Sequence, residues 1–72
     1  PAVFLRAAEK LGVAPADCLV FEDICAGVLA AKRAGMTVFG VFDPAAAEEE
    51  AAIRAAADGY IRDFRDAPFY NG

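Results

Sequence analysis

Two kinds of apolar pattern alternate along the chain. Residues 1–12 carry apolar side chains at positions i, i+1, i+4, i+5 and i+8, a spacing that predicts an amphipathic helix. These apolar positions are Val3, Phe4, Ala7, Ala8 and Leu11. Gly12 follows where a glycine commonly ends a helix. Residues 25–35 predict a second helix, with Val28 and Ala31 on one side and Gly35 as its stop signal.

The second kind of pattern is a short, continuous apolar run. Residues 18–22, 36–42 and 59–61 have this character and predict strands, the first of them buried on both faces as in a parallel sheet. Residues 43–59 predict a third helix, with Asp43 as its N-cap and Pro44 as its first residue. Ile53 is the only large apolar residue of that helix. Residues 62–72 are expected to form an irregular tail.

Helices and strands therefore alternate, beginning with a helix and joined by short connections. This order is typical of an α/β fold in which helices cover a parallel sheet. The crossovers between consecutive parallel strands should be right-handed.

Length and composition narrow the class of protein. A chain of 72 residues with 58% hydrophobic residues holds at most one small domain, and its apolar content suggests a piece of a larger protein. Two cysteines and no histidine are too few for a disulfide framework or a usual zinc site. The net charge of −4, without a basic stripe, argues against nucleic acid as a partner. No apolar run approaches a membrane span, so we expect a soluble, cytoplasmic protein with reduced thiols.

Glu22 and Asp23 stand side by side at the end of the first predicted strand. In open parallel sheets, ligands bind beyond the carboxyl ends of the strands. One interpretation is structural: Asp23 caps the next helix, and Glu22 is solvated beside it. The other is a magnesium site, because Mg²⁺ is commonly held by one or two carboxylates with water and a substrate phosphate. Position alone leaves both interpretations open.

A series of motifs surrounds the acidic pair. In order, the chain has Pro-x-x-Phe-Leu, Leu-Gly-Val-x-Pro, the Glu-Asp pair, a glycine at position 27 and Ala-Ala-Lys-x-Ala-Gly-Met. Together they resemble the C-terminal part of the haloacid dehalogenase (HAD) superfamily, in particular its β-phosphoglucomutase-like phosphatase branch. Residues 57–66 also resemble the last strand of that family and its exit. The resemblance covers nearly the whole chain.

The resemblance implies a fold, a cofactor and roles for particular residues. The fold would be a three-layer α-β-α Rossmann-like parallel sheet, of which residues 1–72 form the C-terminal part only. Asp23 matches the direct Mg²⁺ ligand of the family's fourth motif, and Glu22 matches the neighbouring acid, which binds the metal directly or through water. Gly27 matches the glycine that opens the following helix. Ile24 is bulkier than the small residue often found there, so a polar contact from that position is not expected.

The implied activity needs groups that this sequence does not contain. The family's aspartate nucleophile and its acid/base lie in an Asp-x-Asp-Gly motif, which is absent here. We therefore expect a phosphatase that hydrolyses a small phosphorylated metabolite through an aspartyl-phosphate, with the nucleophile strand and the cap segment in a missing N-terminal part of the same protein. Residues 1–72 alone should be inactive. They supply metal ligands but no catalytic residue, and no substrate-binding residue is assigned. Alternatives are a sugar-phosphate mutase on the same scaffold, a receiver-like signalling module and a non-catalytic remnant.

The other candidate residues are expected to be structural. Cys25 lies at a helix start without a histidine to activate it and is interpreted as a small turn residue, while Cys18 packs in a strand. The glutamates of residues 48–50 are interpreted as a solvated first helical turn. Gly40 suggests a close backbone approach. Three aromatic residues near the C-terminus either cover the sheet or lie where a missing segment should sit: Phe64, Phe69 and Tyr70.

Overall fold

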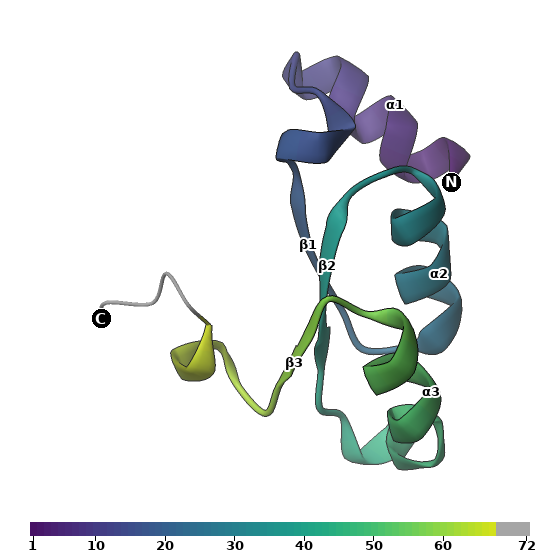
Figure 1. Cartoon of the computed structure of the whole chain (residues 1–72), viewed down its shortest axis with the longest axis vertical. Coiled ribbons are helices and arrows are strands. Elements are labelled where there is room, and N and C mark those ends of the chain that lie inside the picture. The colour runs from purple at the N-terminus through teal and green to yellow at the C-terminus, as the bar shows by residue number, and fades with distance from the viewer. Residues whose placement is uncertain (68–72) are drawn as a thin grey trace.

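The computed structural model describes residues 1–67 and has the predicted order of helices and strands (Figure 1). The helices are α1 (Ala2–Leu11), α2 (Cys25–Arg33) and α3 (Glu50–Ala56). The strands are β1 (Leu19–Glu22), β2 (Thr37–Val41) and β3 (Gly59–Ile61). Short 3₁₀ segments lie between and after them: η1 (Pro15–Asp17), η2 (Pro44–Glu49) and η3 (Phe64–Asp66).

The strands form one parallel sheet in the order β1-β2-β3. Leu19 pairs with Thr37 and Glu22 with Gly40, so β1 and β2 end almost level with each other. The α/β class with a parallel sheet is thereby confirmed. Because the strands are parallel, the residues that follow β1 and β2 meet at the same edge of the sheet.

One face of the sheet carries the main core. The helices α2 and α3 lie on this face in Figure 1. Val28 and Ala31 of α2, Val38 of β2 and Ile53 of α3 form a buried cluster. Ile53, the single large apolar residue of its segment, is only 1% exposed. One fully buried side chain is thus enough to attach this helix to the core, although the helix has no other large apolar residue.

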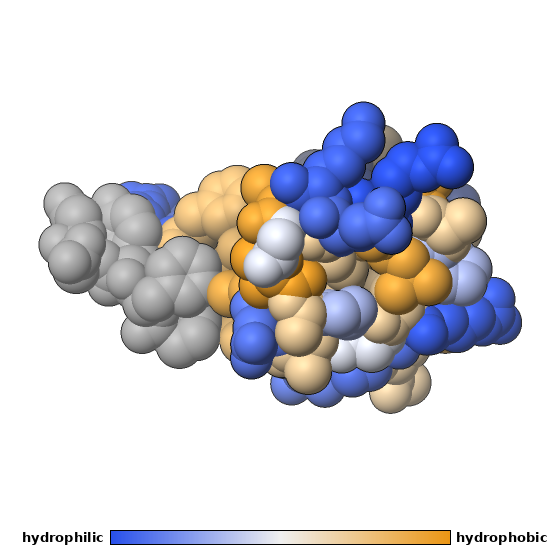
Figure 2. All heavy atoms as spheres, turned by 90° about the horizontal axis from the view of Figure 1, so that it is seen from above, coloured by the Kyte–Doolittle hydropathy of each residue, from blue (hydrophilic) through white to orange (hydrophobic). Residues whose placement is uncertain are grey.

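The apolar stripe predicted for α1 is only partly buried. Ala8 packs with Ala34 and Met36, and Phe4 is half-buried against them. Seen from the end that carries α1, orange apolar atoms lie among blue charged ones (Figure 2). Val3 and Leu11 remain 79% and 74% exposed. The helix contacts the rest of the chain along one edge, so the outer part of its stripe stays in solvent.

The opposite face of the sheet is aromatic. The ring centroids of Phe21 and Phe39 lie 6.0 Å apart, and the Phe64 ring meets Phe21 edge-on at 5.2 Å. In Figure 1, η3 lies on this side, away from α2 and α3. Phe64 is 57% exposed, so it covers Phe21 only in part. Phe69 and Tyr70 lie outside the described residues.

The third predicted helix is not continuous, which corrects the sequence interpretation. Asp43 is the predicted N-cap, and its Oδ1 accepts from the Ala45 N–H at 3.0 Å. Buried Ala46 then has non-helical angles of φ −118° and ψ 25°, and the segment divides into η2 and α3. The expected irregular tail also contains a short element, because η3 forms one 3₁₀ turn with a capping box between Asp63 and Asp66.

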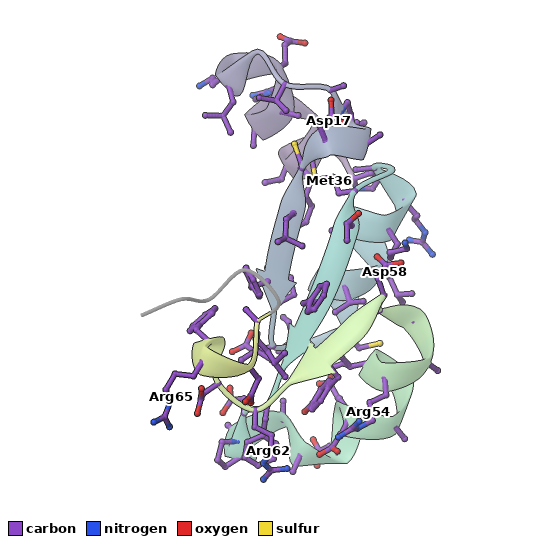
Figure 3. The ribbon with its side chains drawn as sticks, turned by 60° about the vertical axis from the view of Figure 1, so that its left-hand side comes forward. Asp17, Met36, Arg54, Asp58, Arg62 and Arg65 are labelled. Atoms are coloured by element: carbon purple, nitrogen blue, oxygen red, sulfur yellow. The ribbon has the colours of Figure 1, made fainter. Side chains whose placement is uncertain are left out.

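Two details hold the helices and strands in place. Gly12 and Gly35 have φ of 69° and 85°, the left-handed conformation expected of the glycines that end these helices. Asp58, labelled in Figure 3, lies just before β3, and its carboxylate accepts from Lys32 Nζ of α2 and, at 2.8 Å, from the Val38 N–H of β2. Asp58 thereby connects one helix and two strands.

Within residues 1–67, no helix has the length and apolar character that a membrane crossing requires.

Candidate functional site

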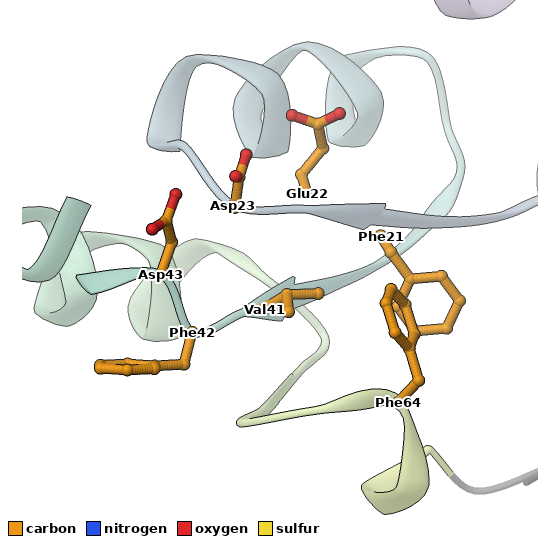
Figure 4. A pocket seen from close by; sticks show the side chains of 7 residues that line it. All are labelled: Phe21, Glu22, Asp23, Val41, Phe42, Asp43 and Phe64. Carbon is orange, nitrogen blue, oxygen red and sulfur yellow. The ribbon is translucent and has the colours of Figure 1, made fainter. Parts of the chain in front are cut away.

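A hollow of about 380 Å³ lies at the carboxyl ends of β1 and β2 (Figure 4). Figure 4 shows three carboxylates on one side of these strand ends and aromatic rings on the other. The lining residues are Phe21, Glu22, Asp23, Val41, Phe42, Asp43 and Phe64. The predicted acidic pair therefore lies at the edge of the sheet where parallel α/β folds bind ligands.

Glu22, the last residue of β1, turns its half-buried side chain toward the first turn of α2. A Cβ atom at Gly27 would overlap the Glu22 carboxylate, so only glycine leaves room for this arrangement. Burial raises the pKa of Glu22 above its ordinary value, and the neighbouring negative charge of Asp23 raises it further. Both causes penalise the ionised form, and a cation bound at the pair would offset them.

Asp23 is exposed and does not cap α2. Ile24 occupies the N-cap position, and no cap from its side chain is present. The Cys25 N–H instead donates to Glu49 Oε1 at 2.7 Å. The structural interpretation of Asp23 as a helix cap is therefore wrong, and its carboxylate points to the hollow rim (Figure 4).

Asp43 combines the predicted capping role with a place at the hollow. Asp43 lies just after β2, as Asp23 lies just after β1. The connection after β2 therefore adds a third carboxylate to the rim, beside those of Glu22 and Asp23. Within residues 1–67, however, no three acidic, cysteine or histidine side chains form a group that could hold a metal ion. Glu22 and Asp23 are a donor set that fits Mg²⁺, whose remaining ligands would be water, phosphate or other parts of the protein. Mg²⁺ binding itself stays a prediction.

Comparisons with known proteins bear directly on this site. No family model matches the chain. It is 42% identical over 71 residues to the "Probable pseudouridine-5'-phosphatase" of Drosophila melanogaster, covering 96% of this chain and 31% of that protein. It is 54% identical over 41 residues to the beta-phosphoglucomutase of Bacillus subtilis, covering 57% of this chain and 18% of that protein. A crystal structure of a HAD family hydrolase from Deinococcus radiodurans R1 with bound phosphate and sodium matches with a TM-score of 0.73 and 32% identity, over 83% of this chain and 28% of that one.

The chain belongs to the haloacid dehalogenase superfamily. The family predicted from the motifs is thereby confirmed, together with its Rossmann-like α/β fold. The chain spans less than a third of each of these relatives.

One residue of this HAD chain was missed by sequence reasoning. Glu49, interpreted as part of a solvated helical turn, is half-buried and bonded to the backbone of the β1–α2 turn. The bond joins residues 24 positions apart, so no local pattern could have indicated it.

The cysteines agree with their predicted structural roles, because Cys18 and Cys25 are both free and half-buried.

A cation lies against the apolar side of the hollow. The Arg62 guanidinium lies 4.2 Å from the centroid of the Phe42 ring, which lines the hollow. A cation over an aromatic face is attracted by the ring and holds its orientation. Phe42, Phe21 and Phe64 thus give the hollow an apolar side facing away from the carboxylates (Figure 4).

Proposed function

We propose that the protein containing this chain is a Mg²⁺-dependent phosphatase that hydrolyses a small phosphorylated metabolite through an aspartyl-phosphate. One observation carries the proposal: the Glu22–Asp23 pair lies at the hollow beyond β1 in a chain of the haloacid dehalogenase superfamily. The name of the Drosophila relative and the phosphate in the Deinococcus structure support an activity on phosphate esters.

The two carboxylates have distinct roles in this proposal. Asp23, which is exposed at the rim, binds Mg²⁺ directly, and Glu22 binds it directly or through water. Bound Mg²⁺ would offset negative charge on the transferring phosphoryl group. Gly27 leaves the space in which the Glu22 carboxylate lies against the first turn of α2.

The covalent steps need groups from the N-terminal part of the same protein. An aspartate carboxylate there attacks phosphorus, and the bond between phosphorus and the leaving oxygen breaks. The acid/base aspartate of the same motif gives a proton to the leaving oxygen and then takes one from water. This water attacks the aspartyl-phosphate, the bond between phosphorus and the aspartate oxygen breaks, and inorganic phosphate and the free carboxylate are released. This chain contributes the metal-binding carboxylates and one side of the sheet. The complete protein acts in the cytoplasm on a small metabolite rather than on nucleic acid or membrane.

A sugar-phosphate mutase is the second candidate, favoured by the similarity to the Bacillus subtilis beta-phosphoglucomutase. The two reactions differ in where the phosphoryl group goes. A phosphatase transfers it to water, while a mutase returns it to the sugar at another position.

The experiment uses the complete protein with p-nitrophenyl phosphate and with a set of sugar phosphates. We expect release of inorganic phosphate that stops when EDTA removes divalent cations and resumes when Mg²⁺ is added. Conversion of a sugar phosphate to its isomer, with little free phosphate, would establish the mutase instead. Phosphate release that is unchanged by EDTA would contradict the metal-dependent mechanism.

A further inference from the structure

The first turn of α2 is held by a side chain from a distant part of the chain. At the N-cap position, Ile24 offers no polar group. The Cys25 N–H donates to Glu49 Oε1 at 2.7 Å in a partly buried position. The first N–H groups of a helix need acceptors from outside the helix, and a carboxylate suits the positive end of the helix dipole. Glu49 therefore replaces the cap that the local sequence lacks.

Glu49 differs in this respect from its two neighbours. Glu48 is exposed, and Glu50 pairs with Arg54 one turn later on its own helix at 2.9 Å. Glu49 is the last residue of η2 and directly precedes α3. The break at Ala46 separates this segment from a continuous helix. Of residues 48–50, it is the one whose hydrogen bond reaches another connection of the fold.

The bond ties together the two connections that carry rim carboxylates. Asp23 precedes Cys25 by two residues on the β1–α2 connection, and Asp43 begins the connection that leads to Glu49. The Glu22 carboxylate lies against Gly27 in the same first turn of α2. A displaced start of α2 would therefore move the backbone of Asp23 and the surface on which Glu22 rests.

We propose that Glu49 is a positioning residue that fixes the β1–α2 turn so that Glu22 and Asp23 present their carboxylates to one divalent cation. Glu49 does this through the Cys25 N–H and without contacting the cation. The inference rests on the proposed function, because the cation is the Mg²⁺ assigned there. Groups that orient metal ligands typically change metal affinity by about 10–100-fold when they are removed.

A second explanation must be separated from this one, since a carboxylate near the site also attracts cations by its charge. Two substitutions make opposite changes. Glu49→Gln removes the charge and keeps an oxygen that can accept from the Cys25 N–H. Glu49→Asp keeps the charge and shortens the side chain, so the carboxylate no longer reaches the turn. Glu48→Gln and Glu48→Asp are matched controls on the exposed neighbour.

The measurement is calorimetric titration of the complete protein with Mg²⁺, without substrate, at a temperature where each variant is folded. We expect Glu49→Asp to bind Mg²⁺ about tenfold more weakly, and Glu49→Gln and both Glu48 variants to stay within about twofold of the wild type. The opposite order, a weak Gln variant beside a normal Asp variant, would overturn the positioning role. If Glu49→Asp does not fold, Glu49→Gln decides alone, and a loss of about tenfold in it overturns the inference.

The wild type separates this inference from the function on which it rests. Absence of Mg²⁺ binding by the wild type would overturn the proposed function itself. Normal wild-type binding, together with unchanged binding in Glu49→Asp, would overturn only the role of Glu49.

Discussion

Gly27→Ala should change metal binding and stability in opposite directions. The nearest atoms to a Cβ at position 27 all belong to the Glu22 side chain, with Cγ at 3.1 Å and the carboxylate overlapping it. The new methyl group therefore displaces the end of a flexible side chain and leaves the neighbouring backbone alone. Glu22 can swing toward solvent, but it then loses its place at the start of α2.

The expected magnitudes follow from two separate effects. Alanine in place of glycine inside a helix stabilises a protein by about 0.5–1 kcal/mol. Without Mg²⁺, the free energy of unfolding should therefore stay constant or rise by up to about 1 kcal/mol. Displacing one of two metal-binding carboxylates should weaken Mg²⁺ binding roughly tenfold, which corresponds to about 1.4 kcal/mol.

The assay combines denaturant unfolding in EDTA with Mg²⁺ titration by calorimetry, both on the complete protein. The control is Gly27→Ala in a Glu22→Ala background, where the carboxylate that the methyl group displaces is already gone. In that background, Gly27→Ala should have no further effect on Mg²⁺ binding. Wild-type Mg²⁺ affinity in the single variant, or a clear loss of stability without metal, would refute the packing of Glu22 against Gly27.

Three further predictions concern the core, the Asp58 contacts and the chain alone. Gly40→Ala should lower the unfolding free energy by about 1–3 kcal/mol, because a Cβ there would overlap Ile53 and lie 2.9 Å from Tyr60 Cδ1; an unchanged denaturation midpoint would contradict this packing. Asp58→Ala should destabilise the fold by about 1 kcal/mol near neutral pH, since Asp58 accepts from Lys32 and Val38 but is partly exposed. Residues 1–72 alone should not hydrolyse p-nitrophenyl phosphate, and reproducible Mg²⁺-dependent turnover by the purified chain would refute this.

The Asp58 effect has a defined pH dependence. The hydrogen bond from Lys32, followed by that from the Val38 N–H, lowers the pKa of Asp58 below its ordinary value of 3.8. A lowered folded-state pKa means that the stabilisation is fully present above that ordinary value and is lost as the pH falls through the folded-state pKa. The difference in unfolding free energy between wild type and Asp58→Ala should therefore shrink as the solution becomes more acidic than the ordinary value. A constant difference across this range would contradict the assignment of the stabilisation to the ionised carboxylate.

Most of the fold could be predicted because its signals are local. Apolar periodicity and the terminal glycines at positions 12 and 35 gave the helices, and continuous apolar runs gave the parallel strands. The division of the third helix could not be predicted in this way. Alanines favour a helix throughout residues 45–47, and the break at Ala46 accompanies its burial in the tertiary structure.

The site was predictable to the extent that its residues are adjacent in sequence. Glu22 ends β1 and Asp23 follows it, so the end of that strand indicated their place at the sheet edge. Glu49 gave no such signal, because its contact with Cys25 depends on how the η2–α3 segment packs beside α2. Asp23 was one candidate for the cap of α2, but the acceptor at the start of this helix is Glu49 from that distant segment.

The central claim is that Asp23 binds a divalent cation for phosphoryl transfer, and Asp23→Asn tests it most directly. Asparagine keeps the shape of the side chain and removes the charge that Mg²⁺ needs, while the fold loses no hydrogen-bonded cap at this residue. Mg²⁺ titration and phosphatase kinetics are measured on the complete protein, with Glu22→Gln as a companion expected to have a milder effect. The account predicts near-normal stability, much weaker Mg²⁺ binding and a large loss of turnover in Asp23→Asn. Unchanged Mg²⁺ affinity together with unchanged turnover would contradict it.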